Sequence, residues 1–157
     1  MQINLLCIGK TDDKEITSLI SYYLIRLPKH WNFEIIEIPD VKNAKNLTPD
    51  LLKKEEAKLF LNHIDKNDLV VILDEKGKQF TSREFAQKID MWMNSSVKKI
   101  HLLIGGAYGF SDEIYSRTNE KMSLSKMTFT HQMIRLFIVE QLYRADQILQ
   151  GKPYHND

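Results

Sequence analysis

The sequence predicts a single α/β domain, a mainly parallel sheet flanked by helices. Three observations support this fold class. Four apolar runs of strand length recur along the chain, stretches with helical spacing separate them, and no repeat, low-complexity tract or linker interrupts the 157 residues. A hydrophobic fraction of 43% and a charged fraction of 27% are ordinary for a soluble globular protein. Residues 1–157 are therefore expected to form one domain with its own core.

The first half of the chain predicts two strands and two helices. INLLCIG (3–9) is a continuous apolar run, expected to form a strand, and 15–27 carries one apolar face at helical spacing and ends before Pro28. FEIIEIPD (33–40) alternates and suits a strand at a sheet edge or with one wetter face. The next helix should begin near Pro49, since proline suits the first helical turn.

The second half continues the same alternation. LVVILDEKG (69–77) has the branched apolar run of a central parallel strand, and the helix 82–93 follows it with Ser82 as the expected cap. KKIHLLIGG (98–106) supplies the fourth strand, and Ser111 should cap a short helix. A short SLS segment then leads to the last helix.

The last helix, HQMIRLFIVEQLYRADQILQG (131–151), is apolar round most of its circumference. A helix covering only one sheet face needs a narrower apolar stripe. Either a symmetric dimer or central burial within a monomer would cover the excess, and the short chain favours the dimer.

The charge balance and the single cysteine argue against a strongly basic nucleic-acid-binding protein and against a disulfide-stabilised one. Lys plus Arg number 22 against 21 Asp plus Glu, so a net charge of +1 gives no general attraction to polyanions. A nucleic-acid partner would have to be recognised by shape or a local patch. The single cysteine, Cys7, lies in an apolar run and is expected to be a core residue in a reducing compartment. With no signal peptide and no segment of membrane-spanning length, a cytoplasmic location is expected.

Two loops at the ends of neighbouring predicted strands are the candidate ligand site. LDEKGK (73–78) and IGGAYG (104–109) should meet at one sheet edge, where open parallel sheets bind ligands. Neither matches a P-loop or a dinucleotide fingerprint, which argues against a phosphate cradle but leaves a tight turn or a cofactor loop. Asp74 and Glu75 should point to opposite sides of an extended strand end. The five histidines lack metal-ligand spacing, so no metal is expected.

Three segments together resemble, in order and spacing, the RlmH family of SPOUT methyltransferases. They are LDEKGK, LLIGGAYGF and MSLSKMTFTHQMIRLFIVEQLYRADQILQGKPYH. The family methylates N3 of a pseudouridine in 23S (large-subunit) ribosomal RNA, so the resemblance implies this activity, with the assembled ribosome as substrate. It also implies a C-terminal trefoil knot within about 69–157, a rare exception to unknotted topology. The alternative function is a non-catalytic ribosome- or RNA-binding module with the same fold.

The resemblance further implies a cofactor and an assembly. S-adenosyl-L-methionine would bind bent, without a metal, and leave as S-adenosyl-L-homocysteine. The residues expected to bind it come from three loops: Leu73, Gly105, Gly106, Leu124, Ser125, Lys126, Met127, Thr128 and Phe129. Family members act as homodimers whose catalytic pocket is completed across the interface.

Four residues near the end of the chain are the expected catalytic group. Tyr154 and His155, in the terminal P-Y-H, would place the substrate, with His155 as a candidate base because its ordinary pKa is about 6.5. Arg135 and Arg144 would meet RNA phosphate or the other protomer, two alternatives that the sequence leaves open. Tyr108, in the glycine loop, would lie on the cofactor or simply cover the loop. A local basic patch is expected from Lys76, Lys78 and Lys126.

Overall fold

A five-stranded sheet organises the computed structural model, which describes residues 1–157. Every neighbouring pair of strands is parallel, and the order is β2-β1-β4-β3-β5. The strands are β1 (Gln2–Ile8), β2 (Glu34–Ile38), β3 (Leu69–Gln79), β4 (Lys99–Ile104) and β5 (Glu120–Ser123). The α/β class is confirmed, as is the edge position expected for the second strand.

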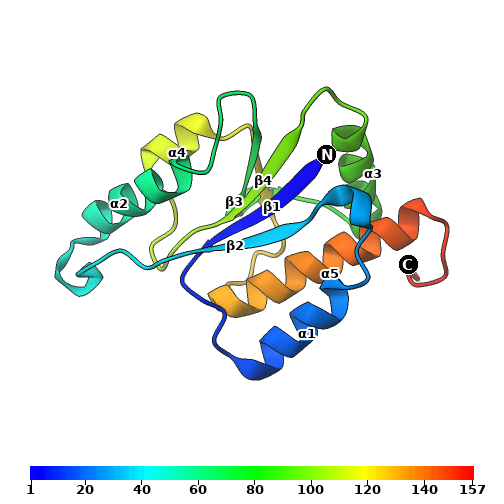
Figure 1. Cartoon of the computed structure of the whole chain (residues 1–157), viewed down its shortest axis with the longest axis horizontal. Helices are drawn as coiled ribbons and strands as arrows, with labels where there is room; N and C mark the ends of the chain where they lie inside the picture. The colour runs from blue at the N-terminus through cyan, green and yellow to red at the C-terminus, as the bar shows by residue number, and fades with distance from the viewer.

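Helices cover both faces of the sheet (Figure 1). One face carries α1 (Lys14–Leu24), α3 (Ser82–Met93) and α5 (His131–Leu149), and the other carries α2 (Pro49–Leu61) and α4 (Asp112–Arg117). Successive strand residues alternate between two cores: Leu102 packs in the α1, α3 and α5 core, and Leu103 in the α2 and α4 core. Burial on both faces explains why the strand runs are continuously apolar.

Some element ends differ from the sequence prediction. The first helix ends at Leu24, not Leu27. The cap of α3 is Thr81, not Ser82: its side chain accepts from the Glu84 N–H, and the Glu84 side chain accepts from the Thr81 N–H. The strand β5, which has only four residues, was not predicted, because so short a run carries no readable periodicity.

The strand β3 is interrupted where it enters LDEKGK. Met122 on β5 pairs with both Leu73 and Lys78, so residues 74–77 project between the two pairings. Gly77 allows this, because a Cβ there would lie 2.6 Å from the Met122 carbonyl carbon. The irregularity places the acidic part of LDEKGK in a bulge of β3, beside the glycine loop.

Most of the apolar surface of α5 is covered by the chain itself. The helix packs against α1, α3 and β4, and Ile138, Val139 and Leu142 are fully buried. Of the two arrangements that the sequence left open, central burial therefore accounts for most of this helix. An uncovered apolar row lies instead along α1 and the residue after it, where Leu19, Tyr22 and Ile25 are 48%, 50% and 79% exposed.

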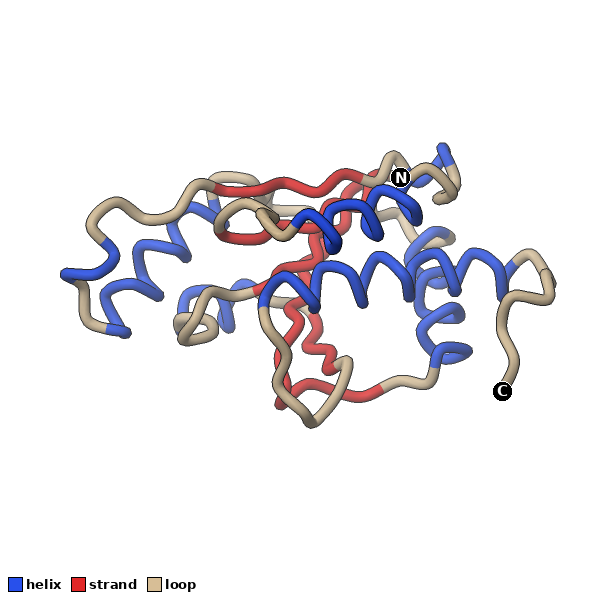
Figure 2. Tube along the Cα trace, turned by 90° about the horizontal axis from the view of Figure 1, so that it is seen from below, coloured by secondary structure: helices blue, strands red, loops and turns tan.

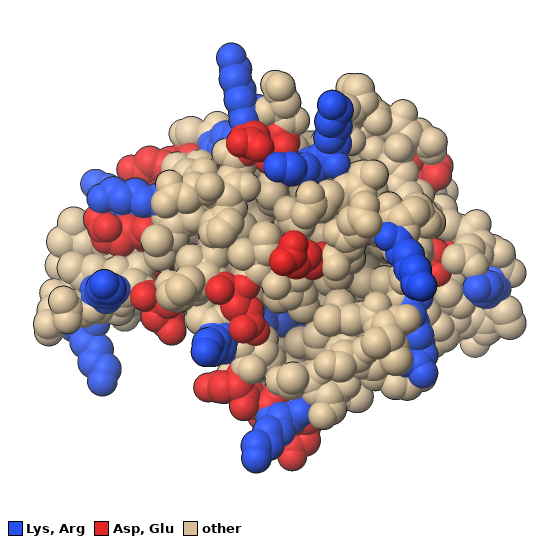
Figure 3. All heavy atoms as spheres, viewed as in Figure 1, with Lys and Arg blue, Asp and Glu red and all other residues tan.

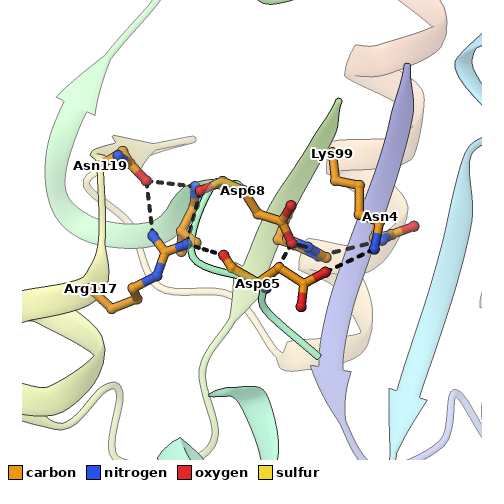
Figure 4. Close-up of polar contacts among 8 residues, drawn as sticks. Asn4, Asp65, Asp68, Lys99, Arg117 and Asn119 are labelled. Atoms are coloured by element: carbon orange, nitrogen blue, oxygen red, sulfur yellow. Dashed lines mark hydrogen bonds and ion pairs between the residues drawn. The ribbon is translucent and has the colours of Figure 1, made fainter. Parts of the chain in front are cut away.

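Near the N-terminal ends of the strands, a polar network crosses the sheet (Figure 4). His101 contacts Asp68 through Nε2 at 2.8 Å and Asn4 through Nδ1 at 3.4 Å. Arg117 donates to the backbone oxygens of Asp65 and Asp68 at 2.7 and 2.9 Å. The network joins the segment before β3 to β1, β4 and α4, at the opposite ends of the strands from the candidate site.

None of the helices combines the length and the apolar character needed to cross a membrane.

Candidate cofactor site

A cavity of about 470 Å³ opens at the C-terminal ends of β3 and β4. Its walls are the bulge of β3 after Leu73, the glycine loop 104–110 and the segment 123–129, together with His131 and Ile134 at the start of α5. The cofactor-binding residues predicted from the sequence meet here: Leu73, Gly105, Gly106, Leu124, Ser125, Met127, Thr128 and Phe129. Lys126 is exposed and is not part of the lining. The volume suits a small organic ligand.

Each glycine in the loop has its own reason to lack a side chain. Gly109 has a φ of +80° and donates its N–H to the Gly106 oxygen at 3.0 Å, which closes a tight turn. A Cβ on Gly105 would lie 3.2 Å from the Gly109 carbonyl carbon. A Cβ on Gly106 would lie 2.5 Å from Oε2 of Glu56, a residue on α2 outside the cavity lining. The loop is thus shaped by contacts within the chain.

Asp74 and Tyr115 form a polar pair in the cavity wall that sequence analysis missed. The Tyr115 hydroxyl donates to Asp74 Oδ2 at 2.5 Å, and the Lys76 N–H donates to Asp74 Oδ1 at 2.8 Å. Burial, followed by the hydrogen bond to Asp74, raises the pKa of Tyr115 to about 12, so the phenol stays protonated. The carboxylate is therefore held in place, whereas a solvated strand end was expected. No three His, Cys, Asp or Glu side chains are grouped to hold a metal ion.

The residues predicted to handle the substrate form a second group, the tail cluster of Glu140, Arg144, Tyr154 and His155. Arg144 donates to Glu140 Oε1 through Nη2 at 2.6 Å, and the Tyr154 hydroxyl donates to the same oxygen at 3.1 Å. Arg144 Nη1 lies 3.3 Å from His155 Nδ1. Burial raises the pKa of Tyr154 above its usual range. The chain end is therefore folded back onto α5 and ordered by several contacts.

The chain ends beyond one end of the long helix α5, as Figure 2 shows, whereas the cavity residues His131 and Ile134 lie at the other end of α5. His131 lines the cavity and Arg144 belongs to the tail cluster, and thirteen residues at 1.5 Å each separate them by about 20 Å. Within one protomer, then, the structure does not bring the predicted cofactor residues and the predicted substrate residues together.

Arg135 is placed apart from both groups. It is 2% exposed and donates to the Ile8 carbonyl oxygen at 2.7 Å and to Thr11 Oγ1 at 2.9 Å. The guanidinium links α5 to the end of β1 and is too buried to contact an RNA phosphate.

Cys7, on β1, is fully buried, and burial raises the pKa of its thiol to about 11. This confirms Cys7 as a core residue.

The three lysines expected to form a basic patch do not share one setting. Lys76 lines the cavity, Lys78 lies 5.0 Å from the centre of the Phe80 ring, and Lys126 is exposed on the segment 123–129. On the face seen in Figure 3, positive and negative side chains are interspersed. Recognition of a polyanion by this face would depend on shape more than on charge.

A cavity at the carboxyl ends of parallel strands, walled by a glycine loop and a segment leading into the last helix, defines a ligand-binding α/β protein. The family model described as "Predicted SPOUT methyltransferase" matches residues 1–155. The chain belongs to the SPOUT methyltransferase family, and this membership fits the expected knotted fold.

Relatives that carry the same name lie very close in sequence. Ribosomal RNA large subunit methyltransferase H of Christiangramia forsetii is 51% identical over 156 residues, covering 99% of each chain. The protein of that name from Cytophaga hutchinsonii is 51% identical over 156 residues, which is 99% of this chain and 100% of its own. The one from Parabacteroides distasonis is 46% identical over the whole of both chains. These relatives confirm the predicted resemblance to the RlmH family.

Proposed function

We propose that the protein transfers a methyl group from S-adenosylmethionine to N3 of a pseudouridine in large-subunit ribosomal RNA, on the assembled ribosome in the cytoplasm. One observation carries the proposal: the three segments expected to bind the cofactor converge on one cavity. The names of the whole-length relatives support ribosomal RNA as the substrate. The near-neutral charge of +1 fits a substrate recognised largely by shape.

The cavity can favour a positively charged cofactor. Asp74 and Glu75 line it together with the single cation Lys76, and Asp74 is held by Tyr115. When bound, S-adenosylmethionine supplies an activated methyl group on a sulfonium. The glycine loop and the segment 123–129 hold and orient it, and positioning of the two reactants supplies most of the rate enhancement. The N3 proton must leave, and His155 is the proposed base.

We further propose a homodimer in which the tail cluster of one protomer completes the cavity of the other. The separation of about 20 Å along α5 supports this arrangement, because one protomer alone keeps the two groups apart. The exposed row of Leu19, Tyr22 and Ile25 along α1 and the residue after it supports it as well, since a symmetric interface would cover these side chains. Arg144 and Tyr154 would then face the substrate across the interface.

Calorimetry followed by a transfer assay tests the proposed function. S-adenosylmethionine and S-adenosylhomocysteine should bind, NAD should not, and labelled methyl groups should pass to ribosomes that lack the modification. Binding of NAD without the adenosyl ligands would contradict the proposal. Binding without transfer would instead favour the non-catalytic ribosome-binding module.

A further inference from the structure

A buried carboxylate lies against the glycine loop on the side away from the cavity. Glu56, on α2, is 6% exposed and does not line the cavity. No salt bridge to Glu56 is formed. Two nearby lysines on the same helix, Lys53 and Lys58, form salt bridges with Asp50 and Glu55 instead. A carboxylate removed from water without a cation is costly, so its position requires a compensating contact.

That contact is the backbone of Gly106. The Gly106 backbone N–H favours the charged form of the Glu56 carboxyl group, and a Cβ at position 106 would lie 2.5 Å from Oε2 and 2.7 Å from Cδ. The carboxylate therefore sits directly on the Gly106 backbone and excludes every side chain there. Gly106 also lines the cavity, so one residue is held by Glu56 on one side and presented to the ligand on the other.

We propose that Glu56 is a positioning residue that holds Gly106, and with it the glycine loop, in the conformation that receives S-adenosylmethionine. The inference rests on the proposed use of the cavity for this cofactor, and it adds a residue outside the cavity that acts through the loop. Gly109 closes the turn through its own hydrogen bond to the Gly106 oxygen, so the position of Gly106 sets that of the whole loop.

The charge of Glu56 makes the contact sensitive to pH. Burial, and then the negative charge of Asp40 in the segment after β2, raise the pKa of Glu56 above its usual range, while the Gly106 N–H opposes the rise. Asp40 is the charged group that faces it from outside α2, and the glycine loop presents only a backbone N–H. Protonation removes the negative charge that the Gly106 N–H favours and so weakens the contact. Affinity for the cofactor should therefore fall as the pH falls toward this raised pKa.

The first test measures the affinity for S-adenosylhomocysteine by calorimetry between about pH 5.5 and pH 8. Wild-type affinity should fall on acidification. Glu56→Gln, which keeps the size but not the charge, should bind about ten-fold more weakly at the upper end and lose most of the pH dependence. Glu55→Gln, on a partly buried neighbour that pairs with Lys58 and does not touch the glycine loop, is the matched control and should follow the wild type. A Glu56→Gln profile equal to that of the wild type would overturn the inference.

The second test uses the steric relation between Glu56 and Gly106. The φ of Gly106 is not positive, and the three atoms nearest to a Cβ added there all belong to the Glu56 carboxyl group. Gly106→Ala should weaken binding about ten-fold in the wild type and have little effect in Glu56→Ala, where the obstacle is gone. Fully additive losses would contradict the inference. If wild-type protein failed to bind S-adenosylhomocysteine at all, the proposed function itself would fall, and this inference with it.

Discussion

Two hydrogen bonds decide which ring nitrogen of His101 carries the proton. Its Nδ1 accepts from the Asn4 amide N–H at 3.4 Å and its Nε2 donates to Asp68 at 2.8 Å, an assignment based on the network. A single proton on Nε2 satisfies both contacts, whereas a second proton on Nδ1 would face the Asn4 donor. Burial lowers the pKa of His101, and the hydrogen bond to Asp68 only partly offsets it. The imidazole is therefore buried and neutral.

The stability of the fold should consequently decrease in mild acid. The unfolded chain takes up a proton at His101 near its ordinary pKa of about 6.5, and the folded chain only at a lower pH. The free energy of unfolding should therefore be unaffected above that pH and fall below it. His101→Gln should cost stability at neutral pH but show a shallower fall in urea titrations across this window. Parallel wild-type and variant curves would show that His101 does not titrate as described.

At the same scale, the sequence could locate the glycine loop but not the neighbours that shape it. Three glycines after a buried strand indicated a turn or a cofactor loop, and the positive φ of Gly109 is the expected turn. The contact between Gly106 and Glu56 could not be predicted, because fifty residues separate the two and α2 gives no sign of a functional face. The pairing of Tyr115 with Asp74 was missed as well, because forty-one residues separate the two along the chain.

Among the elements, α5 connects the most distant parts of the molecule. It carries two cavity residues at its start, Arg135 one turn later and the tail cluster at its end. Its apolar pattern predicted the helix but not its partners, because an all-round apolar helix suits either a dimer or a central position. The chain's own α1 and α3 cover it, so the argument for a dimer now depends on the exposed apolar row beside α1 and on the separation of the cavity from the tail cluster.

The junction between α5 and β1 depends on Arg135. Arg135→Met should lower the free energy of unfolding by about 2–3 kcal/mol, because the Ile8 oxygen and Thr11 lose a buried charged donor. The exposed Arg26→Met is the control and should change stability by less than about 0.5 kcal/mol. Denaturant titrations of both variants give the comparison. If Arg135→Met were as stable as the wild type, the structural role of Arg135 would be contradicted, and the predicted contact with RNA or the other protomer would be favoured again.

For the whole molecule, the open question is whether the cavity and the tail cluster work across two protomers. The fold class, the edge position of β2 and the cavity segments could be predicted from local patterns and the family resemblance. The separation of the cavity from the tail cluster could not, since it depends on how α5 lies on the sheet. The predicted cofactor residues and the predicted substrate residues thus form two separate sites, and a dimer would have to bring them together.

Mixed dimers test this arrangement. Gly105→Val should damage the cavity, where its side chain strikes the Gly109 backbone, and His155→Ala should damage the tail cluster. Each variant alone should be inactive. Co-expressed, they should recover about a quarter of wild-type activity, because half of the dimers would hold one intact composite site. No recovery in verified mixed dimers would place the whole site within one protomer.

The central claim, methylation of a ribosomal pseudouridine, is tested most directly by mass spectrometry of large-subunit ribosomal RNA. The RNA would be compared between wild-type cells, a deletion strain and the deletion strain with the gene restored. The proposed function predicts that one methyl group on one pseudouridine disappears on deletion and returns with the wild-type protein, but not with His155→Ala. An unchanged methylation pattern in the deletion strain would contradict it.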